Sequence, residues 1–100
     1  MLALAVAGAA VGAASKPGLR VMVNGNAGVI HVKGLTTTHS CEIDCTYRYA
    51  PGTKLVIRAQ PAANVTHFVG WRGGCTGSAP TCTLVLRHDT TVTARFAIGG

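Results

Sequence analysis

Four cysteines are the residues of this sequence with the clearest chemistry. By spacing they form two groups, Cys41-x-x-x-Cys45 and Cys75 with Cys82, which six residues separate. An even number of cysteines in a short chain indicates a disulfide framework or a structural zinc site, and four cysteines allow three pairings. Zinc ligands usually come in pairs about two to four residues apart, which Cys41 and Cys45 satisfy but Cys75 and Cys82 do not. We therefore expect no metal and favour the two local disulfides, Cys41–Cys45 and Cys75–Cys82.

Histidines and carboxylates are weaker candidates for catalysis or metal binding. The histidines stand singly, without a His-x-x-x-His pair: His31, His39, His67 and His88. Glu42 and Asp44 lie between the first two cysteines, and a carboxylate pair could serve in general acid–base catalysis or bind a cation. Because no third carboxylate is near them in the sequence, a polar turn closed by a disulfide is the favoured interpretation.

The sequence also lacks a recognisable arrangement for nucleophilic catalysis. Such catalysis needs a nucleophile, a base and an orienting group in contact with one another. The cysteines are consumed if they form disulfides, and no serine stands in a glycine-rich elbow. We therefore expect a protein that is not an enzyme and that needs no cofactor.

The charge of the chain is the remaining clue to function. Nine lysines and arginines against three acidic residues give a formal net charge of +6. A basic sheet face could attract anionic cell-wall polymers, glycans, lipid head groups or extracellular DNA weakly and without specificity. The alternative is a solvated face that keeps the domain soluble. The candidate binding residues are Arg20, Lys54, Arg58, Arg87 and Arg95. Lys33 is expected on the same outward positions.

Alternating apolar and polar residues predict short strands with their apolar residues inward. The clearest is Lys54–Gln60, in which Leu55, Ile57 and Ala59 would face the core. Further strands are expected at residues 19–24, 29–33, 46–49, 66–71, 82–87 and 91–96, with 34–40 as a loop or an edge strand. Thirteen glycines fit many turns. No helix of useful length is expected after Ala14, so the fold class is all-β.

Two connections carry turn signals. The residues from Asn24 to Gly28 tolerate positive φ and predict a hairpin. Cys75 to Cys82 predicts a hairpin loop closed by its disulfide. Both predictions imply that the flanking strands are neighbours in one sheet.

The stretch His67–Cys75 supplies the largest side chains of the core. Phe68 and Trp71 are two of the five aromatic residues, and each can bury roughly 150–250 Å². Gly70 stands between them, and a glycine pair follows Trp71. We expect the structural core to include Phe68, Gly70, Trp71 and Phe96. Because these aromatic residues do not alternate with the basic ones, the pattern argues against a specific platform for single-stranded nucleic acid.

Residues 1–18 have a different composition from the rest of the chain. Met1–Ala14 is small and apolar, and it is shorter than the roughly 20 residues that span a bilayer. It fits the apolar core of a secretory signal, with small residues before a cleavage point, but it lacks the usual basic leader, as a truncated signal would. The alternative is an Ala-rich tail on a cytosolic protein. We expect a secreted or cell-surface protein with no transmembrane segment, one β domain at 19–97 and a tail at 98–100.

The order of motifs resembles a known family. Cys41-x-x-x-Cys45 is followed by Tyr49-Ala-Pro-Gly-Thr53 and a Leu-x-Ile-x-Ala strand. Phe68-Val-Gly-Trp-Arg-Gly-Gly-Cys75 then precedes a Val-Thr-Ala-Arg-Phe96 ending. From Leu19 to Phe96, the chain is similar to the divergent internalin B-type repeat domains of bacterial secreted and surface proteins.

The resemblance implies a small, mostly antiparallel, β-grasp-like fold that is one repeat of a larger exported protein. It also implies a spacer or interaction module rather than an enzyme. Neighbouring repeats of a longer parent protein would then be its immediate partners.

Overall fold

A computed structural model describes residues 16–99 of the chain, and its regular structure there consists of eight strands without a helix. The signal-like segment Met1–Ala14 lies outside the described residues. Within the described part, no helix is long and apolar enough to cross a membrane. The all-β fold class is confirmed. The strands are β1 (Gly18–Gly25), β2 (Gly28–Lys33), β3 (Thr38–Cys41), β4 (Asp44–Arg48), β5 (Thr53–Pro61), β6 (Thr66–Gly73), β7 (Thr81–Leu86) and β8 (Thr90–Ile98).

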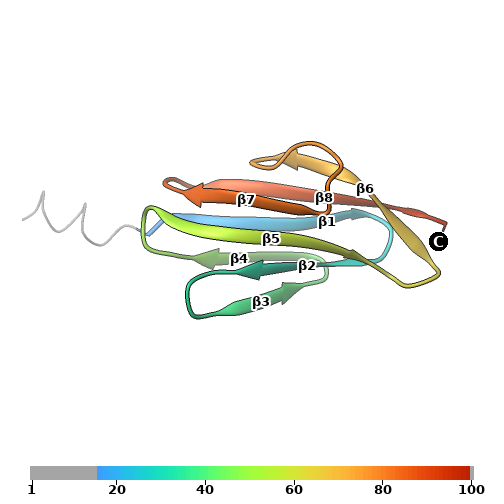
Figure 1. Cartoon of the computed structure of the whole chain (residues 1–100), viewed down its shortest axis with the longest axis horizontal. Coiled ribbons are helices and arrows are strands. Elements are labelled where there is room, and N and C mark those ends of the chain that lie inside the picture. Colours follow the sequence, from blue (N-terminus) through green and yellow to red (C-terminus); the bar gives the residue numbers. More distant parts are fainter. Residues whose placement is uncertain (1–15, 100) are drawn as a thin grey trace, which may run out of the picture.

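Residues 16–99 form two four-stranded sheets that pack face to face (Figure 1). Sheet A has the strand order β4-β1-β8-β6, and sheet B has the order β3-β2-β5-β7. Within these residues β1 and β8 pair in parallel, and every other strand pair is antiparallel. The expected antiparallel-rich β architecture is therefore present, and the described strands enclose a core of side chains.

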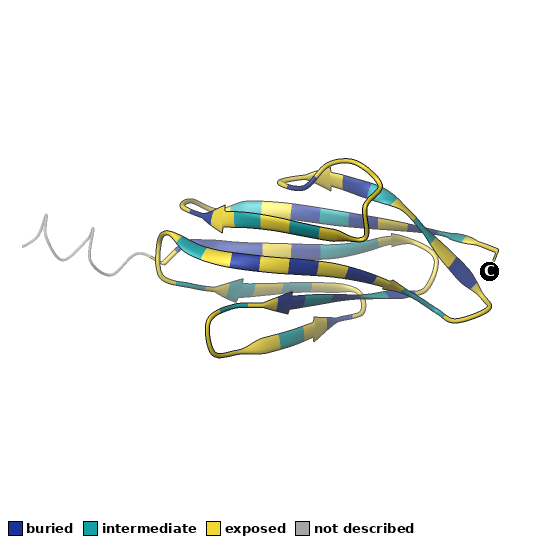
Figure 2. Cartoon of the chain, in the orientation of Figure 1, coloured by how far each residue is buried: buried dark blue, intermediate teal, exposed yellow. Residues whose placement is uncertain are grey.

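The core lies between the two sheets and follows the predicted alternation. In β5, Leu55, Ile57 and Ala59 are buried while the residues between them are exposed, and Figure 2 shows this banding along the strands. β8 repeats the pattern with Val92, Ala94 and Phe96. Every second side chain of a strand points to the same face of its sheet. The inner faces of both sheets therefore contribute to one apolar layer. Its other buried members are Leu19, Val21, Ile30, Val32, Cys41, Trp71, Cys75 and Leu86.

The predicted hairpin at Asn24–Gly28 is wrong, because β1 belongs to sheet A and β2 to sheet B. Both edges of β1 are already occupied, by β4 on one side and β8 on the other. The turn chemistry is used instead to cross the end of the core. Gly25 has φ +86°, and a Cβ on Gly28 would lie 2.4 Å from the ring of Phe96. The glycines thus bring the chain over a core side chain into the other sheet.

Both predicted disulfides are present, and each joins the two sheets at one lateral edge. Cys41–Cys45 connects β3 of sheet B to β4 of sheet A, and these are the edge strands on one side. Cys75–Cys82 connects the loop after β6 to β7 at the opposite edge. The segment between Cys75 and Cys82 is therefore a crossing between sheets, and its prediction as a hairpin loop is wrong. All four cysteines are consumed in these bonds.

A β-bulge explains how Phe68 and Trp71 can both serve the core. Residues three apart on a regular strand face opposite sides of a sheet. In β6 the register with β8 shifts between Phe68 and Gly70, so Val69 is the extra residue. Trp71 is then 6% exposed, Phe68 is half-buried, and their ring centroids lie 5.0 Å apart with the edge of one ring toward the face of the other. Phe68 also packs against Phe96 at 5.7 Å.

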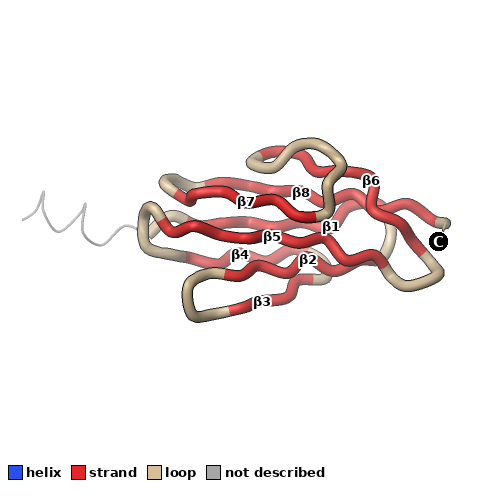
Figure 3. Tube along the Cα trace, in the orientation of Figure 1, coloured by secondary structure: helices blue, strands red, loops and turns tan. Residues whose placement is uncertain are grey.

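The loop between β6 and β7 returns alongside β6 and fixes Trp71 in place (Figure 3). Trp71 Nε1 donates to the carbonyl oxygen of Ala79 at 2.7 Å, and its backbone N donates to Gly77 O at 2.9 Å. A Cβ on Gly70 would approach Gly77 O to 3.1 Å, closer than most real contacts. Gly70 therefore lets the loop lie close to the strand, which is a structural role as expected.

Removing either disulfide should destabilise the domain by about 2–2.5 kcal/mol, because each closes a short loop in the unfolded chain. The matched variants are Cys41→Ser with Cys45→Ser, and Cys75→Ser with Cys82→Ser. Urea unfolding under non-reducing conditions measures the loss. Unfolding midpoints equal to that of the parent would mean that the core alone holds the sheets together.

Trp71→Ala should cost about 3–5 kcal/mol, the usual range for emptying a large aromatic site. Trp71→Phe keeps most of the apolar volume but loses the Nε1 hydrogen bond, so it should cost about 1–3 kcal/mol. Both free energies of unfolding are measured by urea titration. Because these variants lack the single tryptophan of the chain, unfolding is followed by circular dichroism instead of tryptophan fluorescence. A Trp71→Ala protein as stable as the parent would contradict the core assignment.

Candidate functional site

The basic residues singled out from the sequence are exposed, but they are divided between opposite sides of the molecule. Arg20 and Arg95 stand on β1 and β8 of sheet A, whereas Lys54 and Arg58 stand on β5 of sheet B. The sheets pack through their inner faces, so their outer faces point in opposite directions. Arg87 follows the end of β7 in the turn before β8. The single basic face that the sequence predicted is therefore two separate faces, and Arg58 and Arg95 do not share one.

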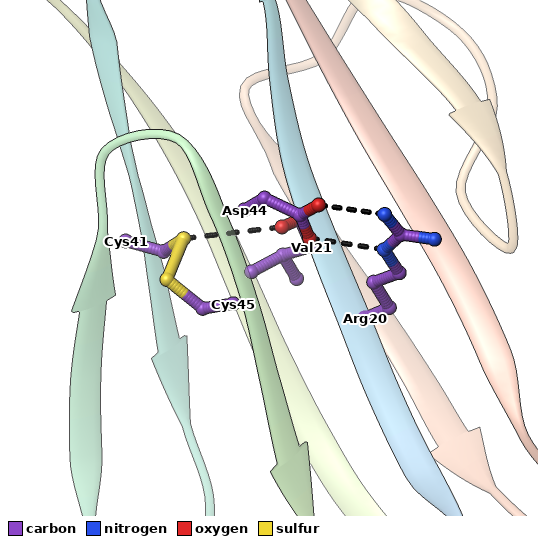
Figure 4. A network of polar contacts seen from close by, with 5 residues as sticks. All are labelled: Arg20, Val21, Cys41, Asp44 and Cys45. Carbon is purple, nitrogen blue, oxygen red and sulfur yellow. Dashed lines mark hydrogen bonds and ion pairs between the residues drawn. A yellow bond between two sulfur atoms is a disulfide. The ribbon is translucent and has the colours of Figure 1, made fainter.

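On the outer face of sheet A, Arg20 is held by a carboxylate of the neighbouring strand. Arg20 Nε donates to Asp44 Oδ1 at 2.9 Å and Nη2 to Asp44 Oδ2 at 2.6 Å, across the β1–β4 pair (Figure 4). This hydrogen-bonded guanidinium lowers the pKa of Asp44, and the carboxylate raises the pKa of Arg20. The side chain of Asp44 remains 37% exposed and that of Arg20 50% exposed, so the ion pair contributes little to the stability of the fold. It does, however, neutralise one of the candidate binding residues.

The pair Glu42 and Asp44 does not converge into an acid–base site. Asp44 points to Arg20 on the outside of sheet A, while Glu42 lines a hollow of about 450 Å³ with Ile43 and the end of β5. Beneath this turn the Cys41–Cys45 disulfide faces β1, with Cys41 Sγ 3.8 Å from the carbonyl oxygen of Val21 (Figure 4). The turn is therefore polar and tied by a disulfide. Within residues 16–99, no group of three histidine, cysteine or acidic side chains is placed to hold a metal ion.

Two further arginines of sheet A were missed by the sequence reasoning. Arg48 on β4 donates from Nη1 to the carbonyl oxygen of Lys16 at 3.0 Å. Arg72 on β6 and Arg95 on β8 flank a shallow hollow of about 200 Å³ beside Gly70. Arg72 and Arg95 lie on the same face because β6 pairs with β8. This pairing joins distant parts of the chain, and the local sequence pattern does not predict it. Sheet A thus carries four arginines, of which Arg20 and Arg48 have hydrogen-bond partners within the domain.

The outer face of sheet B has a different composition. Its four strands carry Lys33, Lys54 and Arg58 and contain no Asp or Glu. Strand register places Arg58 directly opposite His31, and it places Lys33 opposite Val56 one row away. Lys33 and Arg58 are therefore diagonal neighbours, roughly 7–8 Å apart at the backbone. A shallow hollow of about 230 Å³ lies between them, lined by His31, Lys33, Thr38, Val56, Arg58 and Thr81.

His31 is positioned on this face by hydrogen bonds at both ring nitrogens. Nδ1 lies 2.9 Å from Ser40 Oγ on β3, and Nε2 lies 2.6 Å from Gln60 Oε1 on β5. The imidazole therefore bridges three strands. The hollow beside it is lined by cationic side chains, hydroxyl groups and one apolar residue.

At the β3–β4 edge, two aromatic rings close the gap between the sheets. His39 of β3 stacks on Tyr47 of β4, with ring centroids 4.3 Å apart and planes 9° from parallel. Burial raises the pKa of Tyr47, and burial is also the main cause of the raised pKa of Tyr49. These side chains support the edge that Cys41–Cys45 crosses, and we assign them a structural role.

The comparison with known families adds one finding. A sequence model described as the divergent InlB B-repeat domain matches residues 31–100, which is more than half of the chain. The matched segment includes β3 to β8 and both disulfides. No curated protein and no solved structure gives a significant match.

Proposed function

Because the chain belongs to the divergent InlB B-repeat domain family, we propose that it acts as a structural spacer or interaction module of an exported bacterial protein and is not an enzyme. The family supports the assignment as a repeat module of a bacterial surface protein. The geometry of the described residues supports the narrower role of a spacer between neighbouring repeats.

The observation that carries the spacer role is the position of the strands that enter and leave the domain. β1 and β8 are parallel neighbours that run along the sandwich. The chain therefore enters at one end, at Gly18, and leaves at the other, after Ile98 (Figure 1). Successive domains connected through these positions would be joined end to end, and each repeat would add its length to the array.

The two disulfides support export of the domain. Disulfides persist in extracellular and periplasmic compartments and are rare in the cytosol. In a domain of this size, which buries only about two-thirds of its unfolded surface, such links supply stability that the core alone does not. We place the domain in a secreted or cell-surface protein.

Small-angle X-ray scattering of one, two and three tandem copies of the chain tests the spacer role. The maximum dimension should rise by about one domain length with each added copy, because entry and exit lie at opposite ends. The single chain is the reference. A dimension that grows with the cube root of mass instead would show compact packing and contradict the spacer role.

Binding of anionic polymers is a second candidate function, and the outer face of sheet B favours it. There Lys33, Lys54 and Arg58 lie on strands without an acidic residue, whereas Asp44 on sheet A is bound to an arginine. Lys54 and Arg58 are four residues apart on β5, so their charges are spaced by roughly 13 Å along the strand. A linear polymer with repeated carboxylate, sulfate or phosphate groups could contact more than one of them. Such binding would be weak and indifferent to polymer sequence.

Two charge-matched variants test the second function. Lys54→Gln with Arg58→Gln changes sheet B, and Arg72→Gln with Arg95→Gln removes the same charge from sheet A. Retention on immobilised polygalacturonate across a salt series should fall more, and become less salt-dependent, for the sheet B variant. Melting temperatures should stay near that of the parent, since all four side chains are exposed. Equal loss in both variants would mean attraction by net charge alone.

A further inference from the structure

β1 and β8 are hydrogen-bonded directly to each other at the centre of sheet A. Their register runs through seven Cα partners, from Leu19↔Thr90 to Gly25↔Phe96. β4 flanks the pair on one side and β6 on the other. In a protein whose repeats are joined in series, tension enters each domain at the start of β1 and leaves at the end of β8. The β1–β8 ladder therefore connects the two points where force is applied.

Hydrogen bonds at both ends of β1 extend this ladder. Gly18 N donates to Asp89 Oδ1 at 2.8 Å, just before β8 begins. Asn26 N donates to the carbonyl oxygen of Phe96 at 3.0 Å, just after β1 ends. Successive residues of a strand direct their backbone groups to opposite edges, so Met22 and the other even-numbered residues between these two face β8.

Force along the domain loads this ladder in shear. β1 is pulled toward one end of the sandwich and β8 toward the other, parallel to their own axes (Figure 1). All hydrogen bonds of the ladder then resist together. In a hairpin pulled open from one end, by contrast, the bonds break one after another, each at a small force. The parallel pairing is what produces shear, because the free ends of two parallel neighbours point to opposite ends of the sheet.

Neither terminal strand can leave the domain without breaking a second ladder and exposing the core. Removal of β1 also breaks its pairing with β4, and removal of β8 also breaks its pairing with β6. The inward side chains Val21 and Val92 are fully buried, and Phe96 is 1% exposed. Sliding the strands past each other would move these side chains out of their packed positions, which raises the barrier further.

We propose that the β1–β8 ladder is a mechanical clamp, and that carrying tensile load is a further function of this domain. The proposal rests on the spacer role, because only a module joined at both ends receives force along this direction. Forced unfolding is governed by the unfolding rate rather than by equilibrium stability. A domain of ordinary stability can therefore resist force strongly when its terminal strands are loaded in shear.

Single-molecule pulling of the full chain in two directions tests the clamp. One protein carries handles at its two termini. The other carries them at Val65 and at the C-terminus; Val65 precedes β6, whose first residue Thr66 is the partner of Ile98. The second geometry peels β6 from β8 starting at one end. Because the same folded domain is pulled in both cases, equilibrium stability cannot cause a difference. We expect a severalfold higher rupture force between the termini, and equal forces would overturn the clamp.

A pair of proline variants locates the resistance. Met22→Pro removes a backbone donor that faces β8. The carbonyl oxygens of Pro80, just before β7, and of Leu86, at its end, accept hydrogen bonds from Ala59 N and Gly52 N on the β5 side. Thr83 has the opposite parity and faces the open edge, so Thr83→Pro removes no hydrogen bond of the ladder to β5. Rupture force between the termini should fall in Met22→Pro and stay unchanged in Thr83→Pro.

Equal rupture forces in these two variants would overturn the location of the clamp. Circular dichroism establishes whether each variant folds. If Met22→Pro does not fold, the comparison of pulling directions in the parent protein decides alone. The two proposals fail in different experiments. Scattering that shows tandem copies packed compactly would contradict the spacer role, whatever the rupture force of a single domain.

Discussion

β1 and β8 pair in parallel at the centre of sheet A, and the positions of the other strands follow from that pairing. Since both edges of β1 are filled, by β8 and β4, the strand that follows β1 must join the other sheet. β2 therefore begins sheet B, and β3 and β5 pair on its two sides. The same holds at the other end of the chain, where β6 completes sheet A beside β8 and β7 completes sheet B beside β5.

This order places the edge strands in pairs, and the disulfides join those pairs. β3 and β4 are consecutive in the chain and lie at the same lateral edge of different sheets, as do β6 and β7. A connection between consecutive strands that crosses an edge is short, so cysteines at its two ends are close in the sequence. The local spacing of Cys41 with Cys45 is thus a consequence of the topology. A sandwich has open edges where the core is thinnest, and covalent links there hold the sheets in contact.

The sequence predicts the strands and their inward residues well because burial imposes a period of two that any strand of a sandwich must show. Leu55, Ile57, Ala59 and Phe96 were all identified correctly as core residues. What it does not predict is which strands are neighbours. Asn24–Gly28 has the chemistry of a tight turn, but that chemistry permits a reversal within a sheet and a crossing between sheets alike. The crossing is determined by Phe96 of β8, whose ring lies against Gly28. The carbonyl oxygen of Phe96 also accepts a hydrogen bond from Asn26 Nδ2, 70 residues earlier in the sequence.

The same limitation applies to the charged residues. Alternation shows that Arg58 and Arg95 point away from the core. A two-layer fold has two outer faces, however, and the face on which each arginine lies depends on the sheet to which its strand belongs. Likewise, the spacing of Phe68 and Trp71 conflicts with a regular strand, and only the bulge at Val69 allows both to serve the core. In each case the missing information is a long-range contact, which local patterns do not contain.

The covalent links of the domain and its proposed resistance to force are located in different parts of the fold. The disulfides join edge strands and the loop after β6, and neither includes a residue of β1 or β8. They therefore do not carry the load that shears the central ladder. Under tension the disulfides take up load only after that ladder has ruptured. The segments they enclose, with sequence separations of 4 and 7 residues, then cannot extend. A domain built in this way resists tension through backbone hydrogen bonds at its centre, and it retains two covalent links at its edges from which the sheets can reassemble.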